Sequence, residues 1–348
     1  MGDVLQVDFG QKRETVPVSQ EGHTDADEAF VSAELRARGL PWGAGGTVLE
    51  HPVTTGAEIE AAVPGCAFNV LRTPLYAQHG DGPHDRTAID SHVALLRDDT
   101  LAKVGIVGKK YGVVQPRSMW RIFDGMDVKW EQVGSLRGGS ILYAVASVAK
   151  YDVVKGDTVE QLMMLWQALD GSGSVRVIPL GKRLICMNMM SATVRGVQGI
   201  SIRHTRFAEQ RLDFAAKALR RTQEDAVASS RVYQAMAGTR MSGKQFAEVC
   251  MKLIPDMPLD PETGEFAASN GKREANRDQL MANFATGVGQ DIVGVQGTAW
   301  GALNAVTEFT THQRSSKGGE GARVESNVLG SAQRFAGRAY QAIHAMVG

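Results

Sequence analysis

Apolar and polar residues alternate along much of the middle of the chain, a pattern that predicts β-strands. Glycine accepts the positive φ of a tight turn, so Arg137-Gly138-Gly139 and Asp170-Gly171 are each expected to close a hairpin. A polar stretch over residues 78–90 predicts a loop between the first two strands. The predicted strands span residues 68–76, 93–97, 102–107, 128–133, 140–148, 161–168, 174–179 and 183–187.

Apolar residues recur with helical spacing on either side of this β-rich part. Thr54 or Thr55 is placed to cap one short helix, and Pro116 fits the first turn of another. The longest predicted helix spans residues 206–236 and is opened by Arg203-His204. The other predicted helices span residues 25–38, 58–63, 243–254, 272–284, 298–311 and 326–347. This order predicts an α+β fold, with a central antiparallel β-hairpin sheet packed on helices and an α-helical C-terminal region.

The same order divides the chain into three regions. We predict an acidic N-terminal region with short helices (residues 1–66), a β-rich core with central helices (residues 67–221) and an α-helical C-terminal region (residues 222–348). The formal net charge is zero, but its distribution is uneven. Residues 1–60 contain eleven acidic and four basic residues, whereas residues 181–221 contain nine basic and two acidic residues. The second segment can attract a polyanion if its cations share a face.

Composition places the chain among globular proteins. With 348 residues, of which 43% are hydrophobic, the chain is large enough to bury a substantial core. No apolar run approaches the roughly eighteen residues of a membrane span, and the first residues lack the pattern of a secretory signal. We therefore expect a cytoplasmic protein with no membrane partner. Cys66, Cys186 and Cys250 form no CxxC spacing and are predicted to be buried thiols.

The glycine turns and polar clusters match no catalytic motif. Both glycine turns lead into predicted strands, whereas a phosphate-binding loop leads into a helix. His79, His84 and His92 share a stretch with three aspartates, and such a mixture can bind a divalent metal, but the spacing matches no helical ligand pair. We predict that the chain is not an enzyme and holds no metal or cofactor. A metal-dependent nuclease centred on residues 79–92 ranks third among the hypotheses.

The cation-rich segment has two interpretations, which the residues leave open. Arg203, His204 and Arg206 can contact phosphate together with free N–H groups at a helix start. They can equally be surface charges that interact with the acidic N-terminal region of the same subunit or of a neighbouring one. The aromatic residues near basic positions are Tyr111, Trp120, Trp130, Tyr143 and Trp166. Exposed aromatic rings stack on unpaired bases, but most aromatic residues belong to a core, as expected for Trp120. The face that Tyr143 takes stays open.

Several motifs resemble a family of phage- and plasmid-borne proteins, the domain of unknown function 932. The motifs are Pro41-Trp42, residues 110–115, the turns at residues 134–139 and 170–172, residues 183–188, residues 202–205 and residues 298–308. The resemblance extends from about Leu40 to His312. Family members usually place a histidine after the Pro-Trp pair, where this chain has Gly43, so no role of that histidine is transferred.

The resemblance implies a phage, prophage or plasmid protein whose order of hairpins and helix is similar to that of single-strand annealing recombination proteins. By this analogy a single strand of DNA lies in a groove of a ring-shaped homo-oligomer. The residues expected to contact it are Arg137, Lys182, Arg183, Arg203, His204 and Arg206 at the phosphates and Tyr143 at the bases. The leading hypothesis is a non-enzymatic, sequence-independent single-stranded DNA-binding protein of the annealing type. The alternative is a structural or protein-interaction module of a mobile element, whose acidic N-terminal region docks on the basic segment of a neighbouring copy.

Overall fold

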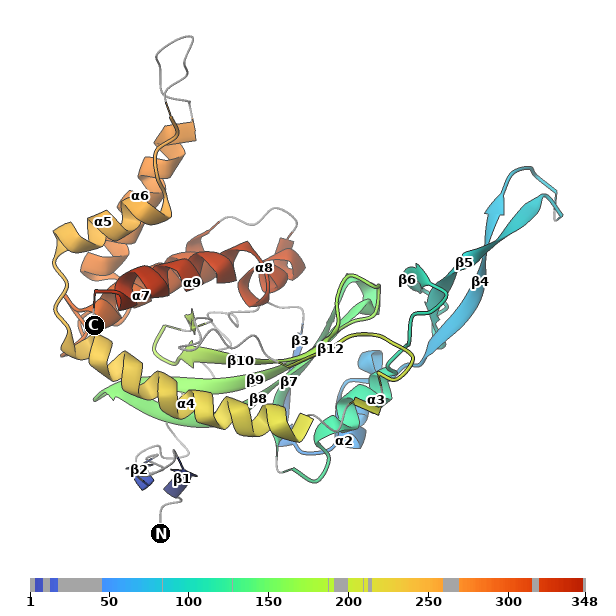
Figure 1. Ribbon diagram of the computed structural model, residues 1–348, viewed down its shortest axis with the longest axis horizontal. Helices are drawn as coiled ribbons and strands as arrows, with labels where there is room; N and C mark the ends of the chain where they lie inside the picture. The colour runs from blue at the N-terminus through green and yellow to red at the C-terminus, as the bar shows by residue number, and fades with distance from the viewer. Residues whose placement is uncertain are drawn as a thin grey trace.

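A seven-stranded antiparallel sheet lies at the centre of the computed structural model, and helices cover both of its faces (Figure 1). The structure describes residues 4–8, 13–17, 46–82, 84–126, 128–186, 188–190, 200–208, 210–211, 215–258, 269–314 and 319–346. The sheet consists of β3 (Gly46–Val53), β7 (Lys129–Leu136), β8 (Ile141–Val154), β9 (Asp157–Ala168), β10 (Val175–Arg183), β11 (Met189–Met190) and β12 (Ile200–Ile202). Its order is β11-β10-β9-β8-β7-β3, with β12 also paired to β10.

Four consecutive strands, β7 to β10, form a meander that confirms both predicted hairpins. Gly138 and Gly171 adopt φ values of 67° and 83° in the two turns, as expected where the chain reverses. The sequence pattern missed a third hairpin, in which β8 turns into β9 at Gly156 with φ 84°. The predicted strand over residues 183–187 is wrong, because β10 ends at Arg183 and the chain turns before β11.

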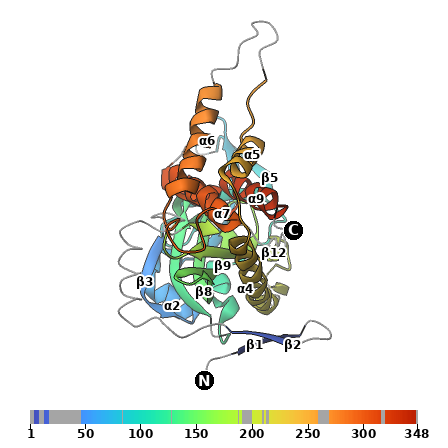
Figure 2. The same ribbon diagram turned by 90° about the vertical axis from the view of Figure 1, so that its left-hand side faces the viewer.

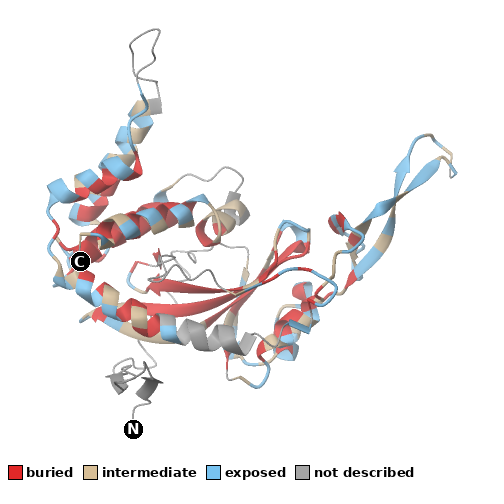
Figure 3. Cartoon of the chain, viewed as in Figure 1, coloured by how far each residue is buried: buried red, intermediate tan, exposed pale blue. Residues whose placement is uncertain are grey.

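A smaller three-stranded sheet extends away from the main sheet (Figure 1). It consists of β4 (Val70–Gln78), β5 (Arg86–Arg97) and β6 (Lys103–Gly108). Because β6 pairs with β5 only from His92 to Leu96, the far parts of β4 and β5 form a two-stranded arm. The predicted loop over residues 78–90 is too long, since β4 ends at Gln78 and β5 already begins at Arg86. The arm is largely exposed (Figure 3), so its sequence lacks the apolar alternation that marks a half-buried strand.

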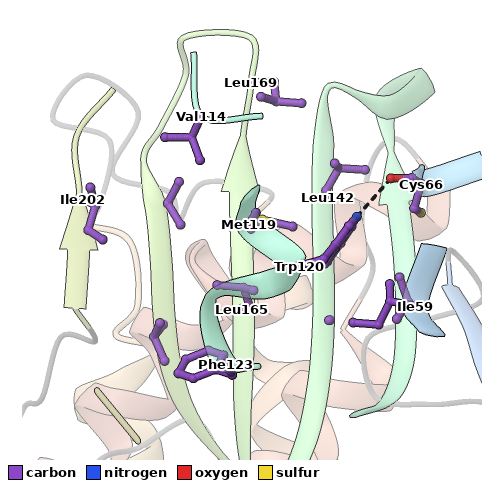
Figure 4. Close-up of a cluster of buried hydrophobic side chains, with 14 of the residues drawn as sticks. Ile59, Cys66, Val114, Met119, Trp120, Phe123, Leu142, Leu165, Leu169 and Ile202 are labelled. Atoms are coloured by element: carbon purple, nitrogen blue, oxygen red, sulfur yellow. Dashed lines mark hydrogen bonds between the residues drawn. The ribbon is translucent and has the colours of Figure 1, made fainter. Parts of the chain in front are cut away.

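Three helices, α2 (Gly56–Ala62), α3 (Pro116–Trp120) and α4 (Ala215–Gly238), lie on one side of the main sheet (Figure 1). Of the two predicted candidates, Thr54 and Thr55, it is Thr55 that caps α2, in a reciprocal pair with Glu58. Trp120 is fully buried against Leu142 and Leu165 of the sheet (Figure 4). Its indole Nε1 donates to the Cys66 carbonyl oxygen at 3.0 Å, so burial of this large ring leaves no polar atom unpaired.

The C-terminal part of the chain forms the predicted α-helical region. Its helices are α5 (Gly243–Leu253), α6 (Ser269–Thr286), α7 (Ala299–Glu308), α8 (Gly319–Val328) and α9 (Ser331–His344). They share a core around Phe246, Trp300 and Tyr340, and α8 packs Val324 and Val328 on the sheet face opposite α4. The single helix predicted over residues 326–347 is wrong. The chain breaks at Gly330, where a Cβ would lie 2.6 Å from the Ser326 Cα.

Figure 2 shows β3 and β12 at opposite edges of the main sheet. A separate two-stranded sheet pairs β1 (Val4–Asp8) with β2 (Arg13–Pro17), and the helix predicted over residues 25–38 lies outside the described residues.

Within the described ranges, no helix has both the length and the apolar character needed to cross a lipid bilayer. The division into three regions and the cytoplasmic location stay predictions.

Candidate nucleic-acid interface

Arg183, predicted to contact phosphate, is instead completely buried. Its Nε donates to Asp157 Oδ1 at 2.6 Å and its Nη2 donates to Asp157 Oδ2 at 2.8 Å. The guanidinium also donates to the carbonyl oxygens of Val288 and Gly289, at 3.0 and 3.1 Å. Trp300 Nε1 completes the cluster with a 2.7 Å hydrogen bond to Asp157 Oδ2. Arg183 therefore joins the sheet to the loop before α7, and the prediction that it faces DNA is corrected.

Lys182 was also predicted to contact DNA, but its side chain is only 6% exposed, so this prediction is corrected. Its Nζ lies 2.5 Å from Glu160 Oε2, and the ammonium of Lys150 lies 3.6 Å from Glu160 Oε1. The three residues occupy facing positions on β8, β9 and β10. Ser147 Oγ donates to the same carboxylate at 2.7 Å. The charge of Lys182 is thus neutralised inside the protein.

Tyr143 and His204 are buried as well, which decides the face that Tyr143 takes. The ring of Tyr143 stacks on Trp166 with centroids 6.1 Å apart, and burial raises the pKa of its hydroxyl. His204 stacks on Tyr111 with centroids 4.7 Å apart, and its Nδ1 lies 3.2 Å from the Gly112 carbonyl oxygen. Burial lowers the pKa of His204. Neither ring is placed to meet a base or a phosphate, so both predicted contacts are corrected.

Arg137 lies in the turn between β7 and β8, where it adopts φ 52°. Its side chain is half exposed but already has two carboxylate partners. Nη2 donates to Glu325 of α8 at 2.6 Å, and Nη1 donates to Asp170 at 3.4 Å. The contact of Arg137 with DNA stays a prediction, in which a phosphate would compete with both carboxylates.

Arg203 and Arg206, the remaining two predicted residues, are exposed. They do not open a helix, because residues 205–208 are a bend and turn and α4 begins at Ala215. The predicted contribution of helix-start N–H groups at Arg203-His204 is therefore wrong. Beside the two arginines the structure places three further exposed cations and one exposed ring, which sequence reasoning missed as a group. We call Lys109, Lys110, Arg203, Arg206, Phe207 and Arg211 the basic surface.

Backbone contacts hold the two halves of the basic surface together. The Gly112 N–H donates to the His204 carbonyl oxygen at 3.2 Å. A Cβ at Gly112 would collide with the Thr205 carbonyl oxygen. The two segments of the chain can therefore approach this closely only because residue 112 is glycine. Arg72 donates to the carbonyl oxygens of Lys109 and Tyr111, at 2.7 and 2.8 Å. The lysine pair and the arginine segment, far apart in sequence, therefore lie side by side.

Among the residues that the structure describes, no carboxylate neutralises the charges of the basic surface. Within the described residues, none of its five cations forms a salt bridge with a carboxylate. Phe207 is 54% exposed, and the guanidinium carbon of Arg206 lies 5.9 Å from the centre of its ring. Exposed cations next to an exposed aromatic ring can engage phosphates and stack on a base.

The hairpin of β4 and β5 carries the three histidines considered for metal binding. Across the described ranges, no three His, Cys, Asp or Glu side chains gather closely enough to hold a metal ion. All three cysteines are buried, as predicted, and burial raises the pKa of Cys66 to about 11 and of Cys250 to about 12. These thiols are therefore protonated at neutral pH and are not primed as nucleophiles.

The fold and the basic surface define an α+β protein whose exposed cations gather at the edge of a helix-covered antiparallel sheet. The family described as domain of unknown function (DUF932) matches residues 103–332, and the chain belongs to this family. The match begins after Pro41-Trp42 and includes all of the basic surface. No curated protein and no solved structure matches the chain. The similarity to recombination proteins stays a prediction.

Proposed function

We propose that this chain binds single-stranded DNA without sequence preference, as a non-enzymatic, annealing-type protein of a phage, prophage or plasmid. The observation that carries the proposal is the basic surface, where five exposed cations, none paired with a carboxylate of the described ranges, lie beside an exposed ring. Assembly of several copies into a ring would align these surfaces into one path for the strand.

The physical basis is the release of counterions and the stacking of bases. A cation that neutralises a phosphate releases a condensed counterion, so binding weakens as salt rises. For five contacts on a single strand, the logarithm of the affinity should fall with the logarithm of salt with a slope of about 3.5. Phe207 offers its face to any base, which explains binding without sequence preference.

The double variant Arg203→Gln/Arg206→Gln is expected to weaken binding and to reduce the salt slope by about 1.4, because two phosphate contacts are lost. Phe207→Ala should lower the affinity by about 1–3 kcal/mol, the cost of one lost stacking contact. Fluorescence anisotropy with a labelled homopolymeric oligonucleotide over a series of salt concentrations measures both effects.

The matched control is Arg117→Gln/Arg121→Gln, which removes the same number of charges. Both arginines are exposed but lie 3.6 and 3.7 Å from the carboxylate of Glu60, so the protein already neutralises them in part. This control should bind as the unaltered protein does. Equal weakening by the two double variants would show that only net charge matters, and no binding at low salt would end the proposal.

A second candidate function, as a protein-interaction module, is favoured by the outer face of the small sheet. Facing positions on β4, β5 and β6 place Leu71 with Leu96, and Thr73 with Ala94 and Ile106. Leu71 is 42% exposed and Ile106 is 50% exposed, although an open sheet face is ordinarily polar. An exposed apolar patch of this kind marks a protein contact.

We propose a second copy of the chain as the occupant of this outer face. The arm carries exposed Asp81 and Asp90, and the opposite end of the same sheet, where β6 begins, carries exposed Lys103. Two sheets packed face to face in opposite directions would bring these unlike charges together. Leu71→Lys/Ile106→Lys should then abolish the dimer in light scattering, whereas Val293→Lys, at a residue 91% exposed elsewhere, should not. A monomeric unaltered chain would contradict this candidate.

A further inference from the structure

Two arginines lie over one phenylalanine of α9, on the side of the sheet opposite α4 (Figure 1), and a third lies one helical turn from one of them. The guanidinium carbons of Arg314 and Arg338 lie 5.5 and 5.7 Å from the centre of the Phe335 ring. Arg334 precedes Arg338 by one helical turn, so both side chains project from the same face of α9. Arg334 and Arg338 are exposed, while Phe335 beneath them is buried. We call Arg314, Arg334 and Arg338 the α9 arginine cluster.

No carboxylate of the described residues forms a salt bridge with this cluster. Other arginines of the chain have such partners: Arg97 pairs with Asp99, and Arg277 pairs with Asp256. Arg314 Nη1 donates to the Ser331 carbonyl oxygen, at 3.1 Å. Burial and then the positive charge of Arg338 lower the pKa of Arg314.

Gathering like charges without a counter-charge is unfavourable for the isolated protein. Cations one turn apart on a helix repel each other, and nothing described in the structure compensates them. An anionic ligand would remove this cost, and planar guanidinium groups bind phosphate through paired hydrogen bonds. Stacking on the Phe335 ring also holds two of the guanidinium groups in place before a ligand arrives.

We propose that the α9 arginine cluster is a second phosphate-binding surface for single-stranded DNA, separate from the basic surface. The proposal rests on the proposed function, because it assigns both surfaces to one strand. A lipid headgroup is a poorer match, since a membrane-binding helix presents exposed apolar residues beside its cations and the ring here is buried. One strand that contacts both surfaces passes from the side of α9 to the edge strand β12.

The test compares Arg334→Gln/Arg338→Gln with the unaltered chain on oligonucleotides of increasing length. On strands long enough to reach both surfaces, the variant should bind more weakly and its salt slope should fall by about 1.4. Arg117→Gln/Arg121→Gln serves again as the charge-matched control. Both altered residues at α9 are exposed, so thermal unfolding followed by circular dichroism should be unchanged.

A second variant separates charge from geometry. Arg314→Lys keeps the positive charge but loses the planar group that stacks on Phe335, so it should weaken binding less than removal of both exposed arginines does. Photo-crosslinking of a thiothymidine strand should also attach DNA to the peptide that contains Phe335, and Arg334→Gln/Arg338→Gln should reduce that product.

The outcomes distinguish this inference from the proposed function. If the unaltered chain binds DNA but Arg334→Gln/Arg338→Gln changes neither affinity nor salt slope, the inference is overturned and the basic surface stands. If the unaltered chain binds no DNA at all, both proposals fall. If polyglutamate binds and the variant loses only that binding, the α9 arginine cluster serves an acidic protein partner and the inference is again overturned.

Discussion

Asp157→Asn is expected to lower the free energy of unfolding by about 3–5 kcal/mol, because it leaves the buried charge of Arg183 without a counter-charge. Asp157 and Arg183 are both completely buried. The carboxylate accepts two hydrogen bonds from the guanidinium and one from Trp300. An amide in its place keeps the shape, but it carries no charge and turns one acceptor into a donor. Urea-induced unfolding at neutral pH measures the change.

Asp99→Asn is the matched control for this prediction. Asp99 also pairs with an arginine, Arg97, at 2.6 Å, but its side chain is 40% exposed. Ion pairs open to water contribute about 0–1 kcal/mol. Arg97 is 11% exposed but also donates to the Gly65 carbonyl oxygen at 3.1 Å, so the control should lose much less stability than Asp157→Asn. Replacing both buried partners, as Asp157→Leu/Arg183→Met, should recover much of the lost stability, since it removes the unpaired charge. Equal effects of Asp157→Asn and Asp99→Asn would contradict a buried ion pair.

The predictable part of the fold is the part in which local chemistry and burial agree. The glycine turns at residues 137–139 and 170–171 and the Thr55 cap could be located because each depends on neighbours within a few residues. The β8–β9 hairpin was missed because the strand was predicted to end at residue 148, whereas β8 continues past the charged Lys150 and Asp152 to Val154. Lys150 pairs there with Glu160, which lies on the next strand and is not evident from the β8 sequence.

The candidate site was harder to predict, because a sequence shows how many charged residues a segment contains but not whether their side chains point to solvent or to the interior. Lys182 and Arg183 belong to the most basic stretch of the chain, yet Glu160 and Asp157 neutralise them from the adjacent strand. Arg203, in the same stretch, faces solvent because the edge strand β12 has just ended. Sequence position alone therefore cannot separate an interior ion pair from a surface cation.

The sequence did not indicate the basic surface or the α9 arginine cluster, and the reason is the same for both. Each is assembled from segments that meet only after folding: Lys109 with Arg203 through Gly112, and Arg314 with Arg338 through Phe335. For the basic surface, Gly112 was the sequence feature that could have indicated a close approach of two segments. The α9 arginine cluster has no comparable sequence feature, because arginine and phenylalanine are ordinary residues on an amphipathic helix.

Glu160→Gln is expected to lower the free energy of unfolding by about 3–5 kcal/mol at neutral pH, because Lys182 would lose its buried partner. The loss should shrink in acid. Burial raises the pKa of Glu160, but the charges of Lys182 and Lys150 and the hydrogen bonds from Lys182 and Ser147 outweigh burial, so the pKa lies below its usual value of 4.5. The carboxylate therefore stabilises the folded chain above that value and loses its contribution as the pH falls through the lowered pKa.

The measurement is urea-induced unfolding of the unaltered chain and of Glu160→Gln at several pH values from 7 down to the acid limit of folding. Other carboxylates titrate in both proteins, so the difference between the two stabilities isolates Glu160. That difference should be largest at neutral pH and should narrow only below about 4.5, once the carboxylate is protonated and resembles the amide. Glu160→Gln/Lys182→Met should show neither the large loss nor its pH dependence, since no buried charge is left unpaired. A difference that stays constant down to the acid limit would show that Glu160 stabilises the sheet through packing and hydrogen bonds and not through its charge.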